Sequence, residues 1–230
     1  METFKIAIAI FVKTPGLSPL KTRLARSIGV QEATDFYRKS LCAVGEVVAS
    51  FAEEKNRGPR VRIFPYFAVA EEEGVKDPLW QDFPVLTQGS GSLGKRLHTV
   101  SQRLFEDHDG VFFLGADAPQ ISLGLLNRAA KLLEEHPFVV GPARDGGFYL
   151  YGCRQHVPLS TWESVTYSQK DTLKELCEGF SHHGLDAKKL ETLRDVDEME
   201  DLSPLLEQLS SMPSLLSTQM TLCRWLATRS

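Results

Sequence analysis

A run of seven apolar residues near the N-terminus, residues 6–12, limits the possible folds more than any other feature of this chain. The run is rich in isoleucine, contains no polar residue and stops at the sequence Lys-Thr-Pro-Gly. A strand with one face in water alternates between apolar and polar residues, whereas an uninterrupted apolar strand is buried on both faces. The run is also far shorter than the roughly 20 residues that a membrane-spanning helix needs. It therefore predicts a central strand of a parallel sheet, and we expect no membrane span.

Strand patterns and helix patterns alternate along the rest of the chain. Further strands are predicted at 61–69, 111–114, 138–140 and 148–151, and helices at 21–28, 31–51, 93–105, 123–135 and 170–178. A closing helical pair is predicted at 199–209 and 214–228. Such alternation indicates an α/β fold whose sheet has parallel strands. Because no repeat or long linker divides the sequence, we expect one domain over residues 1–230, with the helical pair in its last part, residues 203–230.

The charge balance excludes one class of function. The chain carries 26 basic and 30 acidic residues and a net charge of −4, which offers no general surface for nucleic acid. An anionic ligand must therefore be held by a local group of basic residues. The four cysteines are widely spaced and form no C-x-x-C pair, which favours reduced thiols and a cytoplasmic protein over a zinc site or a disulfide framework.

The loop after the first strand is such a local basic group. Residues 1–30 hold one acid and five basic residues, namely Lys5, Lys13, Lys21, Arg23 and Arg26. The loop joins a buried strand to a helix, and ligands of open α/β sheets collect beyond the carboxyl ends of strands, where helix N-termini attract phosphate. The sequence is neither a P-loop nor G-x-G-x-x-G. It indicates either a phosphate-binding loop or a solvated basic turn.

Two groups of carboxylates follow predicted strands. Asp117 lies directly after residues 111–114, where it could hold a metal ion or a ribose, or cap the next helix, a role that Ser122 could also fill. Asp195 and Asp197 follow residues 190–193, Leu-Glu-Thr-Leu, and in an alternating strand they would face the same side. Either could then join Asp117 in an oxygen site for Mg²⁺ or Mn²⁺. The alternative is the solvated acidic first turn of a helix.

A glycine-rich segment, Asp145-Gly146-Gly147, separates two predicted strands. A simple hairpin turn explains this sequence. The alternative is a loop whose missing side chains let a substrate lie against the backbone.

The order of these motifs resembles one protein family. The blocks are Phe11-x-Lys13-x-Pro15, Lys21-Thr22-Arg23-Leu24, Gly91-x-Leu93-Gly94-x-Arg96-Leu97, Gly115-x-Asp117-x-Pro119, Gly141-Pro142-Ala143 with Asp145-Gly146-Gly147, and Asp195-Val196-Asp197 with Asp201-Leu202. Together they look like a small group of bacterial glycosyltransferase-A-like proteins with the nucleotide-diphospho-sugar transferase fold. That group is more distantly related to nucleotidyltransferases of the molybdenum-cofactor and F420 pathways. The resemblance runs from about residue 6 to residue 202.

The resemblance implies an α/β domain with a mostly parallel sheet and helices on both faces. It also implies a metal-assisted site for a nucleotide-activated donor, and it leaves the acceptor unidentified. Lys21 and Arg23 would contact the phosphates of the donor, while Asp117 and Asp197 would bind Mg²⁺ or Mn²⁺, with Asp195 as a further candidate ligand. Lys21, Arg23 and Asp117 are thus the predicted catalytic residues. The substrate-binding residues that the matching blocks imply are Lys13, Pro15, Gly94, Arg96, Asp145, Gly146 and Gly147.

Three functions remain open on the sequence. The first is transfer of a sugar from a nucleotide-diphospho-sugar, to which the resemblance points. The second is nucleotidyl transfer from a nucleoside triphosphate with release of pyrophosphate, because both reactions need the same metal and basic groups. The third is a catalytically silent nucleotide-binding protein, because Ser18 stands where the family has glycine, and Ser92 and Lys95 stand where it has two acids.

Overall fold

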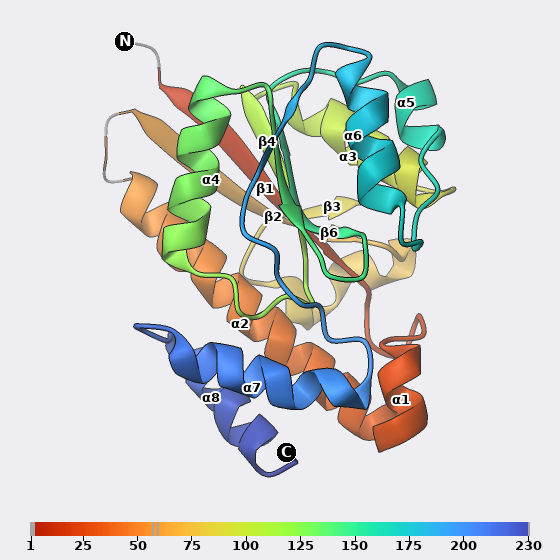
Figure 1. Ribbon diagram of the computed structural model, residues 1–230, viewed down its shortest axis with the longest axis vertical. Coiled ribbons are helices and arrows are strands. Elements are labelled where there is room, and N and C mark those ends of the chain that lie inside the picture. Colours follow the sequence, from red (N-terminus) through yellow and green to blue (C-terminus); the bar gives the residue numbers. More distant parts are fainter. Residues whose placement is uncertain (1–2, 57, 59, 230) are drawn as a thin grey trace.

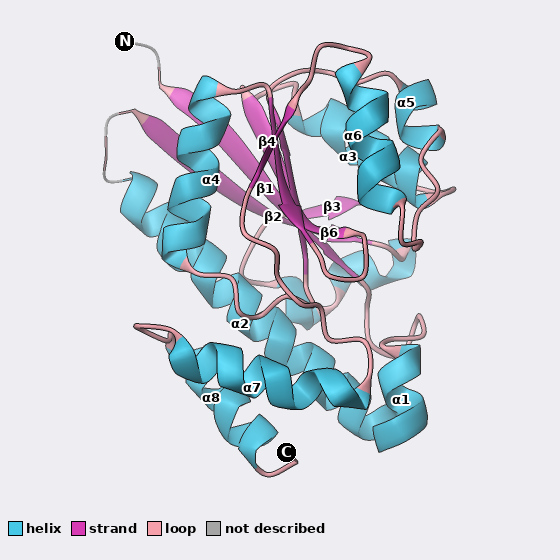
Figure 2. Cartoon of the chain, in the orientation of Figure 1, coloured by secondary structure: helices cyan, strands magenta, loops and turns pink. Residues whose placement is uncertain are grey.

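The computed structural model describes residues 3–56, 58 and 60–229, and within these ranges the chain folds around one seven-stranded sheet. The strand order is β3-β2-β1-β4-β6-β5-β7. The strands are β1 Phe4–Val12, β2 Val61–Val69, β3 Val85–Thr87, β4 Gly110–Gly115, β5 Phe138–Pro142, β6 Phe148–Cys153 and β7 Ala187–Lys189. All neighbouring pairs are parallel except the two that involve β6, which runs antiparallel to β4 and β5 (Figure 2).

The two strands predicted at the centre of the sheet lie there. β1 pairs with β2 on one side and with β4 on the other, and β4 in turn pairs with β6. Ile6, Ile8 and Ile10 are fully buried against one face, and Ala7 and Ala9 against the other. Residues 6–12 are all apolar because helices cover both faces of the sheet at β1.

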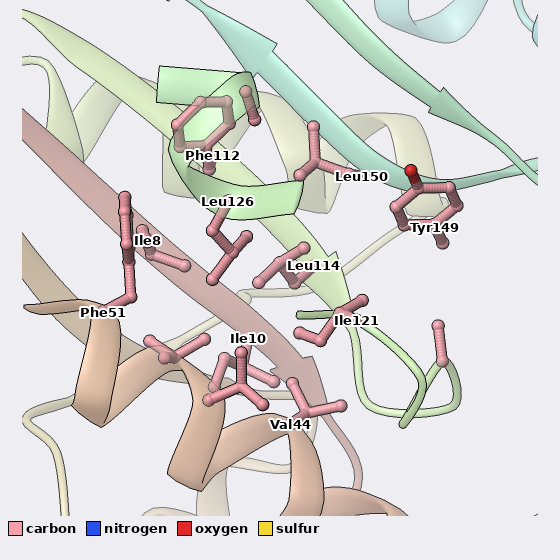
Figure 3. Packing of buried hydrophobic residues seen from close by; sticks show 14 of the residues in the cluster. Ile8, Ile10, Val44, Phe51, Phe112, Leu114, Ile121, Leu126, Tyr149 and Leu150 are labelled. Atoms are coloured by element: carbon pink, nitrogen blue, oxygen red, sulfur yellow. The ribbon is translucent and has the colours of Figure 1, made fainter. Parts of the chain in front are cut away.

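Each face of the sheet carries its own layer of helices (Figure 1). The isoleucines of β1 pack against α2, Val30–Asn56, and α4, Leu123–Glu135. Figure 3 shows Ile8 and Ile10 between Phe51 of α2 and Leu126 of α4. The opposite face packs against α3 Leu93–Leu104, α5 Leu159–Glu163 and α6 Thr172–Ser181.

A third apolar cluster joins the two ends of the chain. It contains Leu24 of α1, Thr22–Ile28, and Phe36 of α2, together with residues of α7, Leu202–Ser211, and α8, Ser217–Ala227. The closing helical pair therefore covers the start of α2 rather than the sheet (Figure 1). The last residue of the predicted pair, Ser230, lies outside the described residues. Short 3-10 helices complete the described elements: η1 Glu72–Lys76, η2 Pro78–Trp80 and η3 Met199–Asp201.

The strand expected at 190–193 is wrong in its position. The strand in this region is β7, Ala187–Lys189, which pairs with β5. Residues 190–193 lie outside this strand but still run beside β5. Leu190 and Leu193 still donate backbone hydrogen bonds to Val140 and Pro142, at 2.9 and 3.0 Å. Among the described residues, no helix is long and apolar enough to cross a membrane.

Candidate active site

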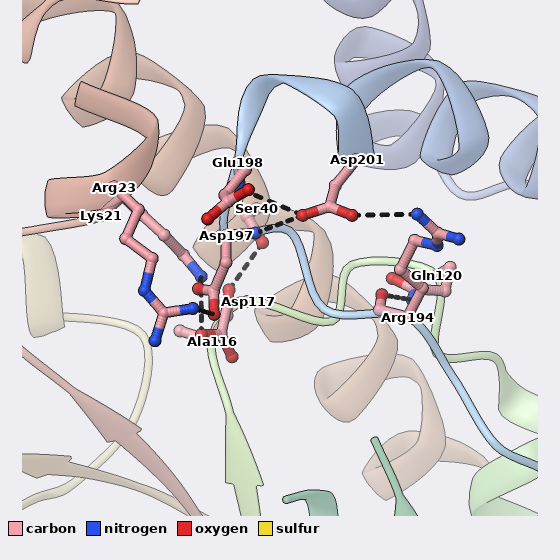
Figure 4. Close-up of polar contacts among 10 residues, drawn as sticks. All are labelled: Lys21, Arg23, Ser40, Ala116, Asp117, Gln120, Arg194, Asp197, Glu198 and Asp201. Atoms are coloured by element: carbon pink, nitrogen blue, oxygen red, sulfur yellow. Dashed lines mark hydrogen bonds and ion pairs between the residues drawn. The ribbon is translucent and has the colours of Figure 1, made fainter. Parts of the chain in front are cut away.

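The candidate site lies where β1 and β4 end. These neighbouring parallel strands finish side by side, with Phe11 opposite Gly115. The loop after β1 leads to Lys21, and the loop after β4 carries Asp117. The chain between β7 and η3 brings Asp197 to the same edge (Figure 4). This is the carboxyl edge at which open α/β sheets bind ligands.

A single ammonium group joins the two predicted metal-binding aspartates. Lys21 Nζ donates to Asp117 Oδ2 at 2.8 Å and to Asp197 Oδ1 at 3.3 Å (Figure 4). The Lys21 side chain is 7% exposed, whereas those of Asp117 and Asp197 are 41% and 34% exposed. Two carboxylates that are distant in the sequence are therefore close enough to share one cation, and both remain open to the cleft.

The charges of this group support one another. Burial alone would lower the pKa of Lys21, but the adjacent carboxylates of Asp117 and Asp197 outweigh burial and raise that pKa. The Lys21 ammonium in turn lowers the pKa of Asp117, against the opposing effect of burial. Both groups are consequently charged at neutral pH.

Arg23 reaches the same group from the first turn of α1. Its Nη1 lies 3.2 Å from Asp197 Oδ2, and its side chain is 57% exposed. An exposed ion pair of this kind contributes little to stability, about 0–1 kcal/mol. The guanidinium therefore remains available for an anion in the cleft.

The Asp201 side chain holds the backbone of Asp197 in place. Asp201 Oδ2 accepts hydrogen bonds from the backbone N–H groups of Asp197 and Glu198, both at 3.0 Å, while its Oδ1 accepts from Arg194 at 3.0 Å. The Arg194 carbonyl accepts a hydrogen bond from Gln120, which fastens this segment to the loop after β4 (Figure 4). Within the acidic run, Asp201 thus closes the turn and leaves the Asp197 side chain for Lys21 and Arg23.

Asp117 does not cap the following helix. Ser122 fills that role, because its hydroxyl accepts the hydrogen bond of the Leu125 N–H at 3.1 Å at the start of α4. The loop is also held by Ser40, whose hydroxyl donates to the Ala116 carbonyl at 2.6 Å. The Asp117 carboxylate is therefore used for Lys21 rather than for backbone capping.

Asp195 lies near this group without joining it. Its Oδ1 is buried and has no hydrogen-bond partner among the described residues. Burial and the neighbouring carboxylates of Asp117 and Asp145 raise the pKa of Asp195 to about 7, although Lys21 opposes the shift. A buried carboxylate oxygen without a partner is costly unless a ligand or cation completes it.

The site opens into a cleft with two adjoining pockets. The larger, about 630 Å³, is lined by Lys13, Lys21 and Arg23 and is called the cationic pocket below. The smaller, about 270 Å³, is called the apolar pocket, and its apolar and aromatic lining residues are Phe11, Leu93, Leu97, Phe113, Leu114, Phe148, Tyr149 and Tyr167. Both pockets share Phe11, Leu93, Gly115, Asp117, Asp145 and Ser168. Lys21, Arg23 and Asp117 thus line one cleft, and Asp195 lines its apolar pocket.

The other predicted substrate-binding residues divide into two groups. Lys13, Asp145 and Gly147 line the cleft, whereas Pro15, Gly94, Arg96 and Gly146 are not among its lining residues. A Cβ atom on Gly94 would lie 2.4 Å from the Trp162 carbonyl oxygen, so this glycine allows α3 to pack closely on α5. Arg96 donates from Nε to the Gly91 carbonyl at 3.1 Å.

The Asp145-Gly146-Gly147 segment is a hairpin turn that also lines the cleft. It connects the antiparallel strands β5 and β6, and Asp145 Oδ1 accepts the Gly147 N–H at 2.8 Å. Gly146 has a φ of +93°, and a Cβ atom there would collide with the Lys170 backbone. Its carbonyl accepts the Leu173 N–H at 2.8 Å, which joins the turn to the start of α6. The hairpin turn is therefore confirmed, and contact of its backbone with a substrate stays a prediction.

Comparison with known proteins gives the family. Residues 54–169 match the model of a family described as an uncharacterized protein conserved in bacteria, DUF2064. The match covers half of the chain. The chain belongs to this family. No curated protein sequence matches it.

Solved structures share the fold of this DUF2064 chain. A candidate nucleotide-diphospho-sugar transferase from Desulfovibrio desulfuricans G20 is 24% identical, with a TM-score of 0.83 over 97% of this chain and 96% of that one. Rv0371c from Mycobacterium tuberculosis H37Rv is 15% identical, with a TM-score of 0.57 over 90% and 100% of the two chains. CMP:2-keto-3-deoxy-manno-octonic acid synthetase, solved with CTP, is 14% identical, with a TM-score of 0.51 over 87% and 96%. The predicted nucleotide-diphospho-sugar transferase fold is confirmed.

Sequence reasoning overlooked three residues that shape the cleft of this DUF2064 chain. The Tyr37 hydroxyl donates to the Lys13 carbonyl and accepts from the Lys13 N–H, both at 2.9 Å, which fixes the basic loop. Gln88 donates from Nε2 to the carbonyls at the ends of β1 and β2. Ser168 has a φ of 60° and lines both pockets. A tyrosine on the apolar face of a helix is typical of a core residue, and no motif marks Gln88 or Ser168 in the sequence.

The carboxylates fit a divalent cation in part. Within the described ranges, no three His, Cys, Asp or Glu side chains are clustered closely enough to hold a metal ion. Asp117 and Asp197 nevertheless share one ammonium ion, and the unpartnered Oδ1 of Asp195 is a further oxygen nearby. Carboxylate oxygens are the ligands that Mg²⁺ and Mn²⁺ prefer. The chemistry of these side chains therefore suits a hard cation that replaces the Lys21 ammonium.

Proposed function

We propose that this protein is a metal-dependent transferase that uses a nucleotide-activated donor, in the first place a nucleotide-diphospho-sugar. One observation carries the proposal: Lys21, Arg23, Asp117 and Asp197 meet in one cleft at the carboxyl ends of β1 and β4. The fold shared with a candidate nucleotide-diphospho-sugar transferase supports it. The four free cysteines support the further proposal that the enzyme works in the cytoplasm.

The basic residues would bind and orient the diphosphate. Arg23 can contact two phosphate oxygens at once, whereas Lys13 and Lys21 act as point charges. Asp117 and Asp197 would hold Mg²⁺ or Mn²⁺, which neutralises negative charge on phosphate oxygens when bound. Lys21, which contacts both carboxylates in this structure, would then be free to contact the same phosphates. The residues thereby stabilise the charge that develops on the departing nucleoside diphosphate.

A second candidate function is nucleotidyl transfer. The observation that favours it is the shared fold with CMP:2-keto-3-deoxy-manno-octonic acid synthetase, solved with CTP, and with 4-diphosphocytidyl-2C-methyl-D-erythritol synthase from Anaerococcus prevotii DSM 20548. The latter is 11% identical, with a TM-score of 0.53. In this reaction the link between the α and β phosphates breaks and pyrophosphate leaves. The same basic residues would serve both reactions.

The test is turnover of a panel of nucleotide sugars and nucleoside triphosphates in the presence of Mn²⁺, with the enzyme stripped by EDTA as the control. Release of a nucleoside diphosphate from a nucleotide sugar supports sugar transfer. Release of pyrophosphate from a triphosphate supports nucleotidyl transfer instead. Binding without any release favours the silent protein, for which Ser18, Ser92 and Lys95 are the motivation. Turnover that is equal with and without metal would contradict the metal dependence.

A further inference from the structure

The apolar pocket differs from the cationic pocket in the side chains that line it: it has no basic residue among its described lining residues. Its volume, about 270 Å³, lies just below the roughly 300–1,000 Å³ of sites that hold drug-sized ligands. A single aromatic ring or a short alkyl group is therefore a suitable occupant. Leu97, Phe113, Leu114 and Tyr149, which line it, are nearly or fully buried, so these walls belong to the core and are already in place.

The tyrosine and threonine hydroxyl groups of the lining are already hydrogen-bonded to backbone carbonyls outside the pocket. Tyr149 donates to the Glu191 carbonyl at 3.0 Å, and Tyr167 donates to the Trp162 carbonyl at 3.1 Å. The Thr172 hydroxyl donates to the Thr166 carbonyl at 2.8 Å. The tyrosines therefore contribute rings rather than hydroxyls to the pocket, which makes it less polar than its composition suggests.

The charged residues of the apolar pocket are all acidic. Asp117, Asp145 and Asp195 line it, and no Lys, Arg or His is among its described lining residues. The basic residues of the cleft, Lys13, Lys21 and Arg23, line the cationic pocket. A phosphate or carboxylate in the apolar pocket would lie beside like charges and would lose its hydration without a cation in return.

We propose that the apolar pocket binds the acceptor, and that the acceptor is an uncharged hydroxyl compound with an aromatic or short alkyl group. This rests on the proposed function, because the carboxylates shared with the cationic pocket place the acceptor next to the donor. In the sugar transfer, the acceptor oxygen bonds to C1 of the sugar and the bond from C1 to the diphosphate oxygen breaks. The electron pair leaves with the nucleoside diphosphate, and the hydroxyl proton is released to water.

Three matched probes test the chemistry of the pocket. These are 2-phenylethanol, 2-phenylethyl phosphate and glycerol, titrated against the wild-type protein with saturation-transfer NMR. We expect 2-phenylethanol to bind at least about tenfold more tightly than its phosphate ester, since the lining of the pocket offers the phosphate no basic side chain in return for its lost hydration. Glycerol, which lacks an apolar group, should bind at least as poorly as the ester. Equal or tighter binding of the ester or of glycerol would overturn the proposal.

A positively charged side chain introduced into the lining of the apolar pocket tests whether the three probes bind there. Gln169 is exposed, lines the apolar pocket and uses its backbone N–H, not its side chain, to bond Thr172 at 3.0 Å. We expect Gln169→Arg to shift the preference toward 2-phenylethyl phosphate by about tenfold. The matched control is Gln81→Arg, an exposed position outside both pockets, which should leave the preference unchanged. An unchanged preference in Gln169→Arg would mean that the probes bind elsewhere and would overturn the proposal.

A parallel titration with UDP and Mn²⁺ separates this proposal from the proposed function. If UDP binds and 2-phenylethanol does not, the acceptor proposal fails and the function stands. If no nucleotide of a UDP, GDP, CDP and ADP series binds, the proposed function fails. The acceptor role then fails with it, even where 2-phenylethanol binds.

Discussion

The two pockets of the cleft share six lining residues and yet offer opposite chemistry. The cationic pocket has Lys13, Lys21 and Arg23 on loops and at the start of a helix. The apolar pocket has four buried side chains of strands and helices in its wall, Leu97, Phe113, Leu114 and Tyr149, and its charged residues are acidic. Asp117 and Asp145 line both. The difference matches what the proposed donor and acceptor require, namely a charged group on one side of these carboxylates and an uncharged group on the other.

Backbone strain is concentrated on the same cleft. Among the described residues other than glycine, only Lys21 and Ser168 have a positive φ, at 42° and 60°. Lys21 lines the cationic pocket, and Ser168 lines both pockets. Such conformations cost about 1–3 kcal/mol each and occur where function requires a side chain in a particular place. At Lys21 the strained backbone directs the ammonium inward to Asp117 and Asp197.

The largest effect is expected from Asp117, because it lines both pockets. We expect Asp117→Asn to weaken Mn²⁺ binding by about 100-fold or more, since a neutral amide replaces a charged ligand. Metal-dependent UDP binding should be lost with it. The melting temperature should change by only a few degrees, because the amide oxygen still accepts from Lys21 and Ser122, not Asp117, caps α4. Calorimetric titration with Mn²⁺ and a thermal melt measure the two effects.

The matched control for Asp117→Asn is Asp82→Asn, an exposed aspartate outside both pockets. It removes the same charge, so Mn²⁺ and UDP binding should remain at wild-type strength. A fall in melting temperature of ten degrees or more corresponds to a loss of roughly 3 kcal/mol or more in the free energy of unfolding for a chain of this size. Such a fall in Asp117→Asn but not in Asp82→Asn would assign Asp117 a structural role instead.

A smaller effect is expected from Arg23, and it should be confined to the cationic pocket. We expect Arg23→Lys to weaken UDP binding by about three- to tenfold, because lysine keeps the charge but cannot grip two phosphate oxygens. The side chain is more than half exposed, so stability should not change measurably. Binding of 2-phenylethanol should not change either, which separates the two pockets. Equal UDP affinities would leave the phosphate contacts to Lys13 and Lys21.

The sequence predicted most of the fold because its central elements are long and strongly patterned. β2 and α4 have the predicted bounds, and β1 extends the apolar run by two residues. The three-residue strands β3 and β7 were not predicted, since such short strands show no periodicity, and β7 reads Ala-Lys-Lys. The strand was instead predicted at residues 190–193, directly after β7, because two of these four residues are leucines. Two apolar residues do not determine where an edge strand begins and ends.

The candidate site was predictable as a set of residues but not as a geometry. Strand ends identified Asp117, and the acidic run identified Asp197, so their approach to a shared cation could be expected. Lys21 reaches these carboxylates from a left-handed backbone conformation directly before α1. The sequence gives no signal of this conformation, because the position holds neither glycine nor asparagine. The apolar pocket was not predicted, because Tyr167 reaches β4 only through the packing of α5 and α6 over the sheet.

The smallest effect is expected from Tyr37, which supports the cationic pocket from below the basic loop. Tyr37→Phe removes the two hydrogen bonds to Lys13, at a cost of about 1 kcal/mol each. We expect UDP binding to weaken by about two- to threefold as the loop loosens, with 2-phenylethanol binding unchanged. Tyr66→Phe is the matched control, since it removes a half-buried hydroxyl outside both pockets. Titrations of both variants with both ligands measure this. Equal weakening of UDP and 2-phenylethanol in Tyr37→Phe would show that the basic loop supports the whole cleft, and that the two pockets are not independent.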